Sequence, residues 1–144
     1  AMHKAAHLYR AVLEGVAYSL LDAYEIVSAT GPQIDKMYMC GGGAKSRMWR
    51  DMIADVFGTE TTDMSHGGGA ALGAALLGGA AGGAYADLFQ ACGQAVKCGA
   101  VSKPDQNRHE RYHSYAKLYK KLYQSLKEDF KMLSKLQRED GSAF

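Results

Sequence analysis

Near the start of the chain, apolar side chains recur every three or four residues, which predicts an amphipathic helix from Ala5 to about Ser28. Thr30, Gly31 and Pro32 should end this helix, because glycine adopts the left-handed conformation that closes helices and proline cannot continue them. The apolar pattern is wide, so we expect a broad face of the helix to be buried. That face comprises Leu8, Val12, Leu13, Val16, Leu20, Leu21, Tyr24 and Val27.

The next segment combines strand and helix patterns. Residues 36–40 form a short, mostly apolar run that stops at Gly41, which favours a buried strand. A helical period returns from Ser46 and ends at Gly58, and β-branched residues then predict a second strand over 59–63. This order predicts a βαβ unit with two parallel strands. Trp49, Met52, Ile53 and Val56 form the apolar face of the helix, and Arg50, Asp51 and Asp55 occupy the other face.

The second half of the chain is predicted to be helical. Residues 67–84 carry no charge and are rich in glycine and alanine, and Asp87 is placed to cap a short helix that ends near Lys97. A long helix should then run from about Gln106 to Leu136, with residues 137–144 as a frayed tail. Its stripe of tyrosine, leucine and phenylalanine suits packing on the rest of the domain, and a coiled-coil seam is the alternative.

The sheet expected from these patterns is small. We find no convincing strand after Met64, and two parallel strands cannot form a sheet with both faces covered. The sequence therefore predicts a piece of a larger α/β protein, with the rest of the sheet encoded upstream.

Composition excludes several classes of protein. The chain has 144 residues, of which 47% are hydrophobic, and a net charge of +2, which excludes general disorder and argues against a nucleic-acid binder. Residues 67–84 are too poor in large apolar side chains to predict a membrane span. The cysteines, Cys40, Cys92 and Cys98, are odd in number and form no C-x-x-C pair, which fits the reducing cytoplasm.

The glycine turn from Gly41 to Ser46 is the first candidate for chemistry. It lies between a strand and a helix, where glycine lets a ligand approach the backbone and the helix N-terminus favours phosphate. It matches neither known phosphate loop: Ala44 stands where a Walker A loop needs glycine, and Ser46 stands where the dinucleotide fingerprint needs its third glycine. A tight turn without a ligand is the alternative.

His109 and His113 match the H-E-x-x-H pattern of zinc hydrolases, with both imidazoles on one helical face. A third ligand is difficult to find, because Glu128 would lie roughly 22 Å farther along the same helix. We therefore expect a surface helix and no metal ligands, and we keep a zinc hydrolase as an alternative that metal analysis would test.

Several segments in their order along the chain resemble the FGGY family of carbohydrate kinases, at the C-terminal part of the second lobe. They are residues 7–17, the turn at 41–46 with Trp49 and Arg50, residues 54–57, residues 70–77 and the tyrosine-rich terminal helix. The resemblance implies an α/β fold, a partial actin-like ATPase (ribonuclease H-like) domain that is mostly helical with a short two-stranded parallel sheet remnant. It also implies that residues 1–136 are the C-terminal nucleotide-binding portion of the second kinase domain.

The resemblance further implies ATP as phosphoryl donor and a sugar as acceptor in the full-length protein, with D-xylulose as the expected sugar. It places the nucleotide against Gly41, Gly42, Gly43, Ala44, Ser46 and Arg47, and the adenine between helices whose small residues include 67–79. Catalytic residues and Mg²⁺ ligands are expected outside this chain, which alone should be inactive. The alternative is a non-catalytic helical module that mediates self-association, with a homodimer as its product.

Overall fold

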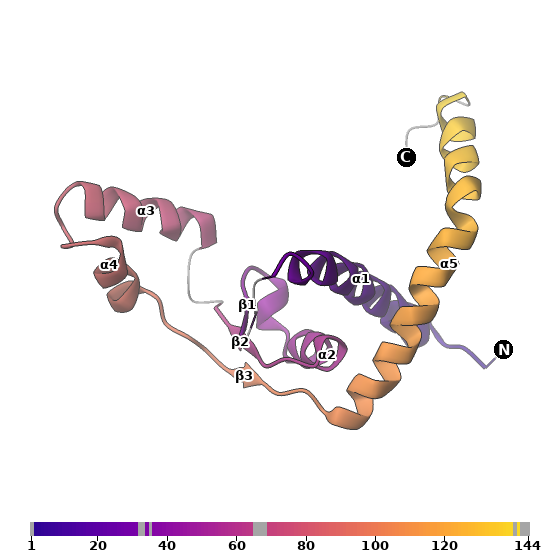
Figure 1. Ribbon diagram of the computed structural model, residues 1–144, viewed down its shortest axis with the longest axis horizontal. Coiled ribbons are helices and arrows are strands. Elements are labelled where there is room, and N and C mark those ends of the chain that lie inside the picture. The colour runs from indigo at the N-terminus through magenta and orange to yellow at the C-terminus, as the bar shows by residue number, and fades with distance from the viewer. Residues whose placement is uncertain (1, 32–33, 35, 65–68, 140, 142–144) are drawn as a thin grey trace.

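The structure, a computed structural model, describes residues 2–31, 34, 36–64, 69–139 and 141. Its elements are the helix α1 (Ala5–Ser28), the strand β1 (Met37–Met39), the 3-10 helix η1 (Gly43–Lys45), α2 (Arg47–Phe57), β2 (Thr61–Asp63), α3 (Gly69–Ala81), α4 (Leu88–Ala95), β3 (Val101–Ser102) and α5 (Gln106–Glu139). In Figure 1, α1 and α2 lie beside the small sheet, α5 starts on the far side of α2 from the strands, and α3, α4 and the end of α5 extend away from this centre.

The sheet has the order β1-β2-β3. β1 and β2 are parallel, as the βαβ pattern predicts, with Met39 paired to Asp63. β3 adds an antiparallel neighbour to β2, so the expectation that no strand follows Met64 is wrong. A strand of two residues is too short to produce an alternating pattern, and it is held by the backbone bond from the Asp63 N–H to the Ala100 carbonyl, 2.9 Å long.

The core lies where α1, α2 and the first half of α5 meet. α2 supplies Met52, Ile53 and Val56, all less than 4% exposed, from the apolar face that the sequence predicts. Tyr18 of α1 and Tyr112 of α5 pack edge to face, with ring centroids 6.2 Å apart. Met37, Met39, Trp49 and Phe57 pack around this cluster, together with Leu13 and Tyr24.

The broad face of α1 is not buried as the sequence predicts. Leu8 and Val12 are about two-thirds exposed, and Ala17, Tyr18 and Leu21 are the buried positions of this helix. The reason is geometric: α2 and α5 pack on one side of α1, and no described element covers the other. Tyr38 of β1, also expected in a buried strand, is 56% exposed.

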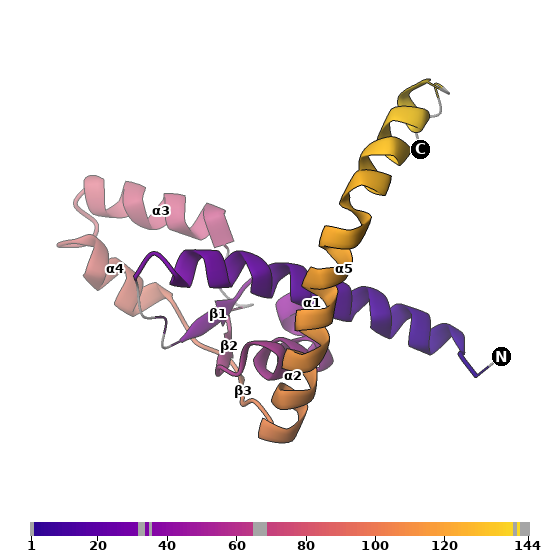
Figure 2. The same ribbon diagram turned by 45° about the vertical axis from the view of Figure 1, so that its right-hand side comes forward.

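α5 crosses the core and then leaves it, as both Figure 1 and Figure 2 show. Tyr112 and Ala116 are its buried positions, whereas Leu126, Phe130 and Leu133 are 41–52% exposed, so the stripe packs on the domain only over its first turns. The helix reaches Glu139 and thus includes residues that the sequence assigns to a frayed tail. Residues 140 and 142–144 lie outside the described part.

α3 and α4 pack against each other in both views and away from α2. Asp87 caps α4 as predicted, because its carboxylate accepts a 2.7 Å hydrogen bond from the Gln90 N–H. The ring of Tyr85 covers Gly79, where a Cβ atom would lie 2.9 Å from it. Of the helices described, none combines the length and the apolar character that a bilayer crossing requires.

Candidate functional site

The glycine turn follows directly from the end of β1. Gly41 has a φ of +78°, in the left-handed region that side chains disfavour, so the chain needs glycine there to turn away from the strand. The next residues wind into η1, where the N–H groups of Lys45 and Ser46 donate to the carbonyls of Gly42 and Gly43 at 3.2 and 3.1 Å. The turn therefore has a defined shape without a ligand.

One side of this turn is open. Cβ atoms added at Gly41 or Gly42 would have no heavy atom within 4 Å, and both residues are exposed. Gly43 differs, because a Cβ there would lie 3.2 Å from Cδ1 of Trp49. Ala44 is 1% exposed, so neither its methyl group nor its backbone is open to a ligand. The open surface is thus bare main chain at Gly41 and Gly42.

The turn leads into the N-terminus of α2. Ser46 caps this helix: its hydroxyl accepts from the Trp49 N–H at 3.4 Å, and its carbonyl accepts from the Arg50 N–H at 3.0 Å. Helix N-termini carry a partial positive charge that attracts anions. Arg47 follows the cap and is largely exposed, with Nε 3.5 Å from the Asp51 carboxylate.

The structure thus brings all the predicted site residues to one place, the turn between β1 and α2. It also places the turn at the carboxyl end of the parallel strands, which is where ligands bind in open α/β sheets. The Gly/Ala-rich helix α3, which the sequence analysis sets against the adenine, packs on α4 and not on α2 in this chain (Figure 1). Residues 67 and 68 of that segment lie outside the described part.

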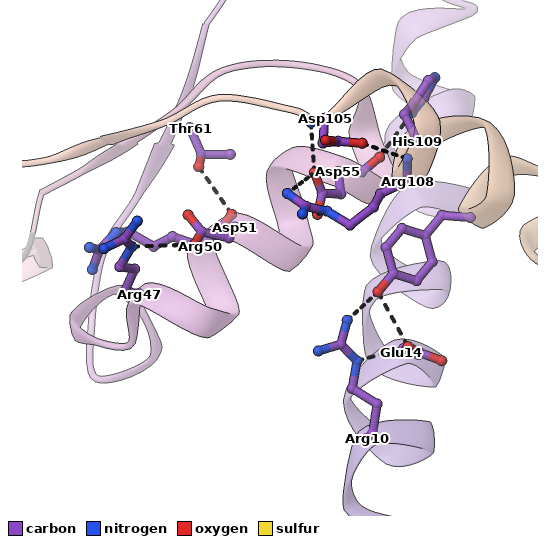
Figure 3. Close-up of polar contacts among 11 residues, drawn as sticks. Arg10, Glu14, Arg47, Arg50, Asp51, Asp55, Thr61, Asp105, Arg108 and His109 are labelled. Atoms are coloured by element: carbon purple, nitrogen blue, oxygen red, sulfur yellow. Dashed lines mark hydrogen bonds and ion pairs between the residues drawn. The ribbon is translucent and has the colours of Figure 1, made fainter. Parts of the chain in front are cut away.

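Arg50 lies on the face of α2 opposite its apolar residues, as the helical period predicts, but this position is buried. Arg50 is 7% exposed, and its guanidinium Nη1 donates to the backbone carbonyl of Ala44 and lies 3.7 Å from the Asp63 carboxylate. The helical period alone cannot identify it, because the strand that provides Asp63 covers this side of α2. Figure 3 shows Arg50 on α2 and Thr61, whose hydroxyl bonds the Arg50 carbonyl.

Asp55 is the second buried charge that the helical period places on the outer face. Its carboxylate accepts from the Asp105 N–H at 2.8 Å and from Nε of Arg108 at 2.7 Å. Both donors come from the start of α5, and Asp105 in turn accepts from the Arg108 N–H at 2.9 Å (Figure 3). These contacts raise the pKa of the Arg108 guanidinium. They anchor α5 to the helix that begins at the glycine turn.

The H-E-x-x-H segment takes part in the same anchor. Nδ1 of His109 lies 2.9 Å from the Asp55 carbonyl, and its ring covers Gly58, which closes α2 with a φ of +66°. Within the described ranges, no group of three or more histidine, cysteine, aspartate or glutamate side chains is arranged to hold a metal ion. His109 therefore has a packing role here, and the zinc-hydrolase alternative gains no support.

A third cluster of polar side chains joins α1 to α5. Arg10 donates to the Tyr112 hydroxyl and to the Glu14 carboxylate, the latter over 2.8 Å, and the Tyr112 hydroxyl lies 3.3 Å from the same carboxylate. Burial raises the pKa of Tyr112 and outweighs the opposing effect of the Arg10 charge. Arg10, Arg47 and Arg108, which line the groove between α1, α2 and α5, are each paired with a carboxylate.

Comparison with known proteins identifies the class. Residues 1–82 match the model of the FGGY family of carbohydrate kinases, C-terminal domain. The match includes α1, the glycine turn, α2 and all of α3. The chain belongs to this family, and its fold is the actin-like ATPase fold expected from the resemblance.

The individual proteins that resemble this chain are also carbohydrate kinases. The chain is 35% identical over 118 residues to a xylulose kinase of Staphylococcus epidermidis, covering 81% of this chain and 24% of that protein. It is 29% identical over 138 residues to a gluconokinase of Bacillus licheniformis, covering 94% of this chain and 26% of that protein. The crystal structure of a ligand-bound xylulose kinase from Lactobacillus acidophilus superimposes with a TM-score of 0.78 at 26% identity, over 87% of this chain and 25% of that one.

The chain therefore spans about a quarter of the length of these relatives.

Proposed function

We propose that this chain is the adenine and ribose side of the ATP site in a longer sugar kinase. The observation that carries the proposal is the open main chain at Gly41 and Gly42, at the carboxyl end of β1 and next to the N-terminus of α2. A nucleoside can lie against bare backbone where side chains would exclude it, and the helix N-terminus favours its phosphates. Membership of the FGGY family supports the same assignment.

Each site residue has a specific role in this proposal. Gly41 makes the turn, Gly42 and Gly43 present backbone to the nucleotide, and the buried Ala44 holds the turn from beneath through its carbonyl bond to Arg50. Ser46 fixes the start of α2, and Arg47 is an exposed cation directly after this cap. Phosphoryl transfer also needs a base for the acceptor hydroxyl and charge stabilisation at the transferred group. We assign these, and the ligands of the Mg²⁺ that accompanies ATP, to the remainder of the polypeptide.

The proposal is tested by titrating ADP into the ¹⁵N-labelled chain and following its backbone amide resonances. We expect shifts concentrated at residues 41–47, with smaller changes in α4 and α5. Shifts concentrated elsewhere, or none at millimolar ADP, would count against the assignment. The same sample, mixed with ATP and D-xylulose, should form no sugar phosphate, since the catalytic base lies outside it.

The sugar is proposed to be D-xylulose. Support comes from the xylulose kinases among the relatives, with a sequence identity of 35% in one and 47% over 77 residues in that of Escherichia coli. A gluconokinase matches a longer part of the chain at lower identity, so gluconate is the competing acceptor. Comparing kcat/KM for the two sugars in the full-length kinase decides between them, and a preference for gluconate would overturn this part of the proposal.

Self-association through α5 is a second candidate function, because the helix leaves the core with its apolar stripe uncovered. Leu122, Leu126 and Phe130 are 41–49% exposed. A homodimer would bury such a stripe. Sedimentation of the full-length kinase should then give a dimer that Leu126→Glu converts to a monomer with an unchanged KM for ATP. A monomeric wild type would exclude this role.

We place the protein in the cytoplasm, where thiols stay reduced. Support comes from Cys40, Cys92 and Cys98, which are all free.

A further inference from the structure

Arg50 is a buried arginine directly beneath the glycine turn. Its side chain is 8% exposed, and its guanidinium Nη1 has two partners, the Ala44 carbonyl and the Asp63 carboxylate. Among the described residues, its Nε atom has no hydrogen-bond partner although it is buried. A buried arginine with an unsatisfied donor is costly, and apolar side chains of similar size often serve stability as well or better. Stability alone therefore does not explain an arginine at this position.

The contacts of Arg50 connect the glycine turn, the N-terminal cap of α2 and the strand β2. Its backbone N–H donates to the carbonyl of the helix cap Ser46, and its backbone carbonyl accepts from the Thr61 hydroxyl at 3.3 Å. Its guanidinium reaches Ala44 in the turn and Asp63 at the carboxyl end of β2. The backbone of Asp63 is itself held by the residues just before β3, through the Ala100 carbonyl and the Gly99 N–H. The turn is thus tied to the sheet through one side chain.

The bond to Ala44 determines how the turn presents its peptide groups. The carbonyl that accepts from Arg50 points into the protein, so the peptide that links Ala44 to Lys45 is fixed in one orientation. A rotated peptide would turn this carbonyl outward, where its negative end would oppose an anionic ligand. A charged donor holds a carbonyl more firmly than a neutral one does.

We infer that Arg50 is a positioning residue for the nucleotide, one that acts through the backbone of Ala44 and does not touch the ligand. This inference rests on the proposed function of the glycine turn. It assigns the Asp63 carboxylate the role of neutralising Arg50, so that the turn is held by a guanidinium without leaving an unpaired buried charge.

The test compares Arg50→Met with Asp55→Asn in the full-length kinase. Asp55→Asn is the matched control, because it also removes a buried charge of α2 from its ion pair but lies on the side of α5 and not at the turn. We expect Arg50→Met to raise the KM for ATP about tenfold, a change that corresponds to ~1.4 kcal/mol. The KM for the sugar should stay unchanged, and Asp55→Asn should leave both values within about twofold. Arg50→Lys should recover part of the ATP affinity, since an ammonium group can still donate to Ala44.

Three results would overturn the inference. They are an unchanged KM for ATP in Arg50→Met, an equal rise of the KM for both substrates, or an Asp55→Asn variant that loses as much ATP affinity. Should Arg50→Met not fold, Arg50→Lys carries the test, with an expected rise of about threefold for ATP alone. Gly42→Val separates the two claims: if it weakens ATP binding and Arg50→Met does not, the positioning role fails and the proposed site stands. If Gly42→Val has no effect, the proposed site itself fails.

Discussion

Nε of Arg108, in the first turn of α5, lies 2.7 Å from Oδ2 of Asp55, in the last turn of α2. The two residues are far apart in sequence, and the helical period of α2 places Asp55 on the side away from its apolar face. In the structure the Asp55 side chain is 4% exposed, because the N-terminal turn of α5 covers it. This pair joins the terminal helix to the helix that starts at the glycine turn.

Asp55→Asn should destabilise the chain by about 2 kcal/mol, the usual range for hydrogen bonds to a charged group. The neutral amide has one acceptor oxygen left for the Asp105 N–H and the Arg108 guanidinium, which both bond the carboxylate now. Urea unfolding of the 144-residue chain measures the change. Asp51→Asn is the control: its pair with Arg47 is exposed, so it should change stability by less than about 0.5 kcal/mol. Equal effects of the two substitutions would contradict the anchoring role of Asp55.

The glycines of the turn should differ in their tolerance of alanine. Gly41 has a φ of +78°, so Gly41→Ala should cost about 1 kcal/mol of folding free energy through backbone strain alone. Gly42 has a φ of −63° and open space around it, so Gly42→Ala should stabilise the chain by about 0.5 kcal/mol. The urea concentrations at the unfolding midpoints of the two variants, compared with that of the unmodified chain, measure these changes in stability. A loss of stability in Gly42→Ala as large as that in Gly41→Ala would mean that the turn is shaped differently.

Gly58→Ala should cost more than Gly41→Ala. It combines a φ of +66° with a Cβ atom 2.6 Å from Cε1 of His109, whose ring is held by its contact with the Asp55 carbonyl. We expect a loss of about 2 kcal/mol. Introducing the same substitution into a His109→Ala background should reduce the loss to the strain term, about 1 kcal/mol. If the stability losses of the two single substitutions simply add up in the double variant, the His109 ring does not pack on Gly58.

The stability of the chain should fall at alkaline pH. Burial, with a smaller effect from the Glu14 charge, raises the pKa of Tyr18 well above its ordinary value of about 10. The unfolded chain therefore releases this proton first. The contribution of Tyr18 is complete below about pH 10 and is lost as the pH rises toward the pKa of the folded state. Lys120 has a raised pKa from its bonds to Glu25 and Asp22 and acts in the same direction.

Unfolding in urea at about pH 9 and about pH 11 measures this loss. Tyr18→Phe should lose less stability over the interval than the wild type, because its ring cannot ionise. Tyr9→Phe is the control, since Tyr9 is 75% exposed and should leave the decline unchanged. A decline in Tyr18→Phe as steep as that of the wild type would show that Tyr18 does not contribute.

Local periodicity predicts most of the elements, because each depends on residues close in sequence. Ala5–Ser28, the helix after Ser46 and the parallel pairing of β1 with β2 all match their expected types and nearly their expected ends. β3 is missed because two residues cannot show a period, and its position depends on bonds to Asp63 far away in the chain.

Burial is predicted less well than secondary structure. A helical wheel separates apolar from polar positions, but whether a face is covered depends on what packs there. Arg50 and Asp55 are buried because β2 and α5 bring partners to them, and Leu8 and Val12 are exposed because no described element covers that side of α1. The glycine turn is visible in the sequence, and its role as a nucleotide site stays a prediction. The burial of Arg50 beneath it depends on Asp63 of β2, so the helical period cannot reveal it.

The KM for ATP of Gly42→Val in the full-length kinase tests the central claim most directly. Gly42 lies in a helical conformation with no neighbour within 4 Å of an added Cβ, so the substitution fills the space of the proposed nucleotide without disturbing the chain. Gly93→Val is the matched control, because Gly93 is also helical and open but lies on α4. The account predicts a KM for ATP at least about tenfold higher in Gly42→Val, with the KM for the sugar and the control variant unchanged. An unchanged KM for ATP in a folded Gly42→Val kinase would contradict it.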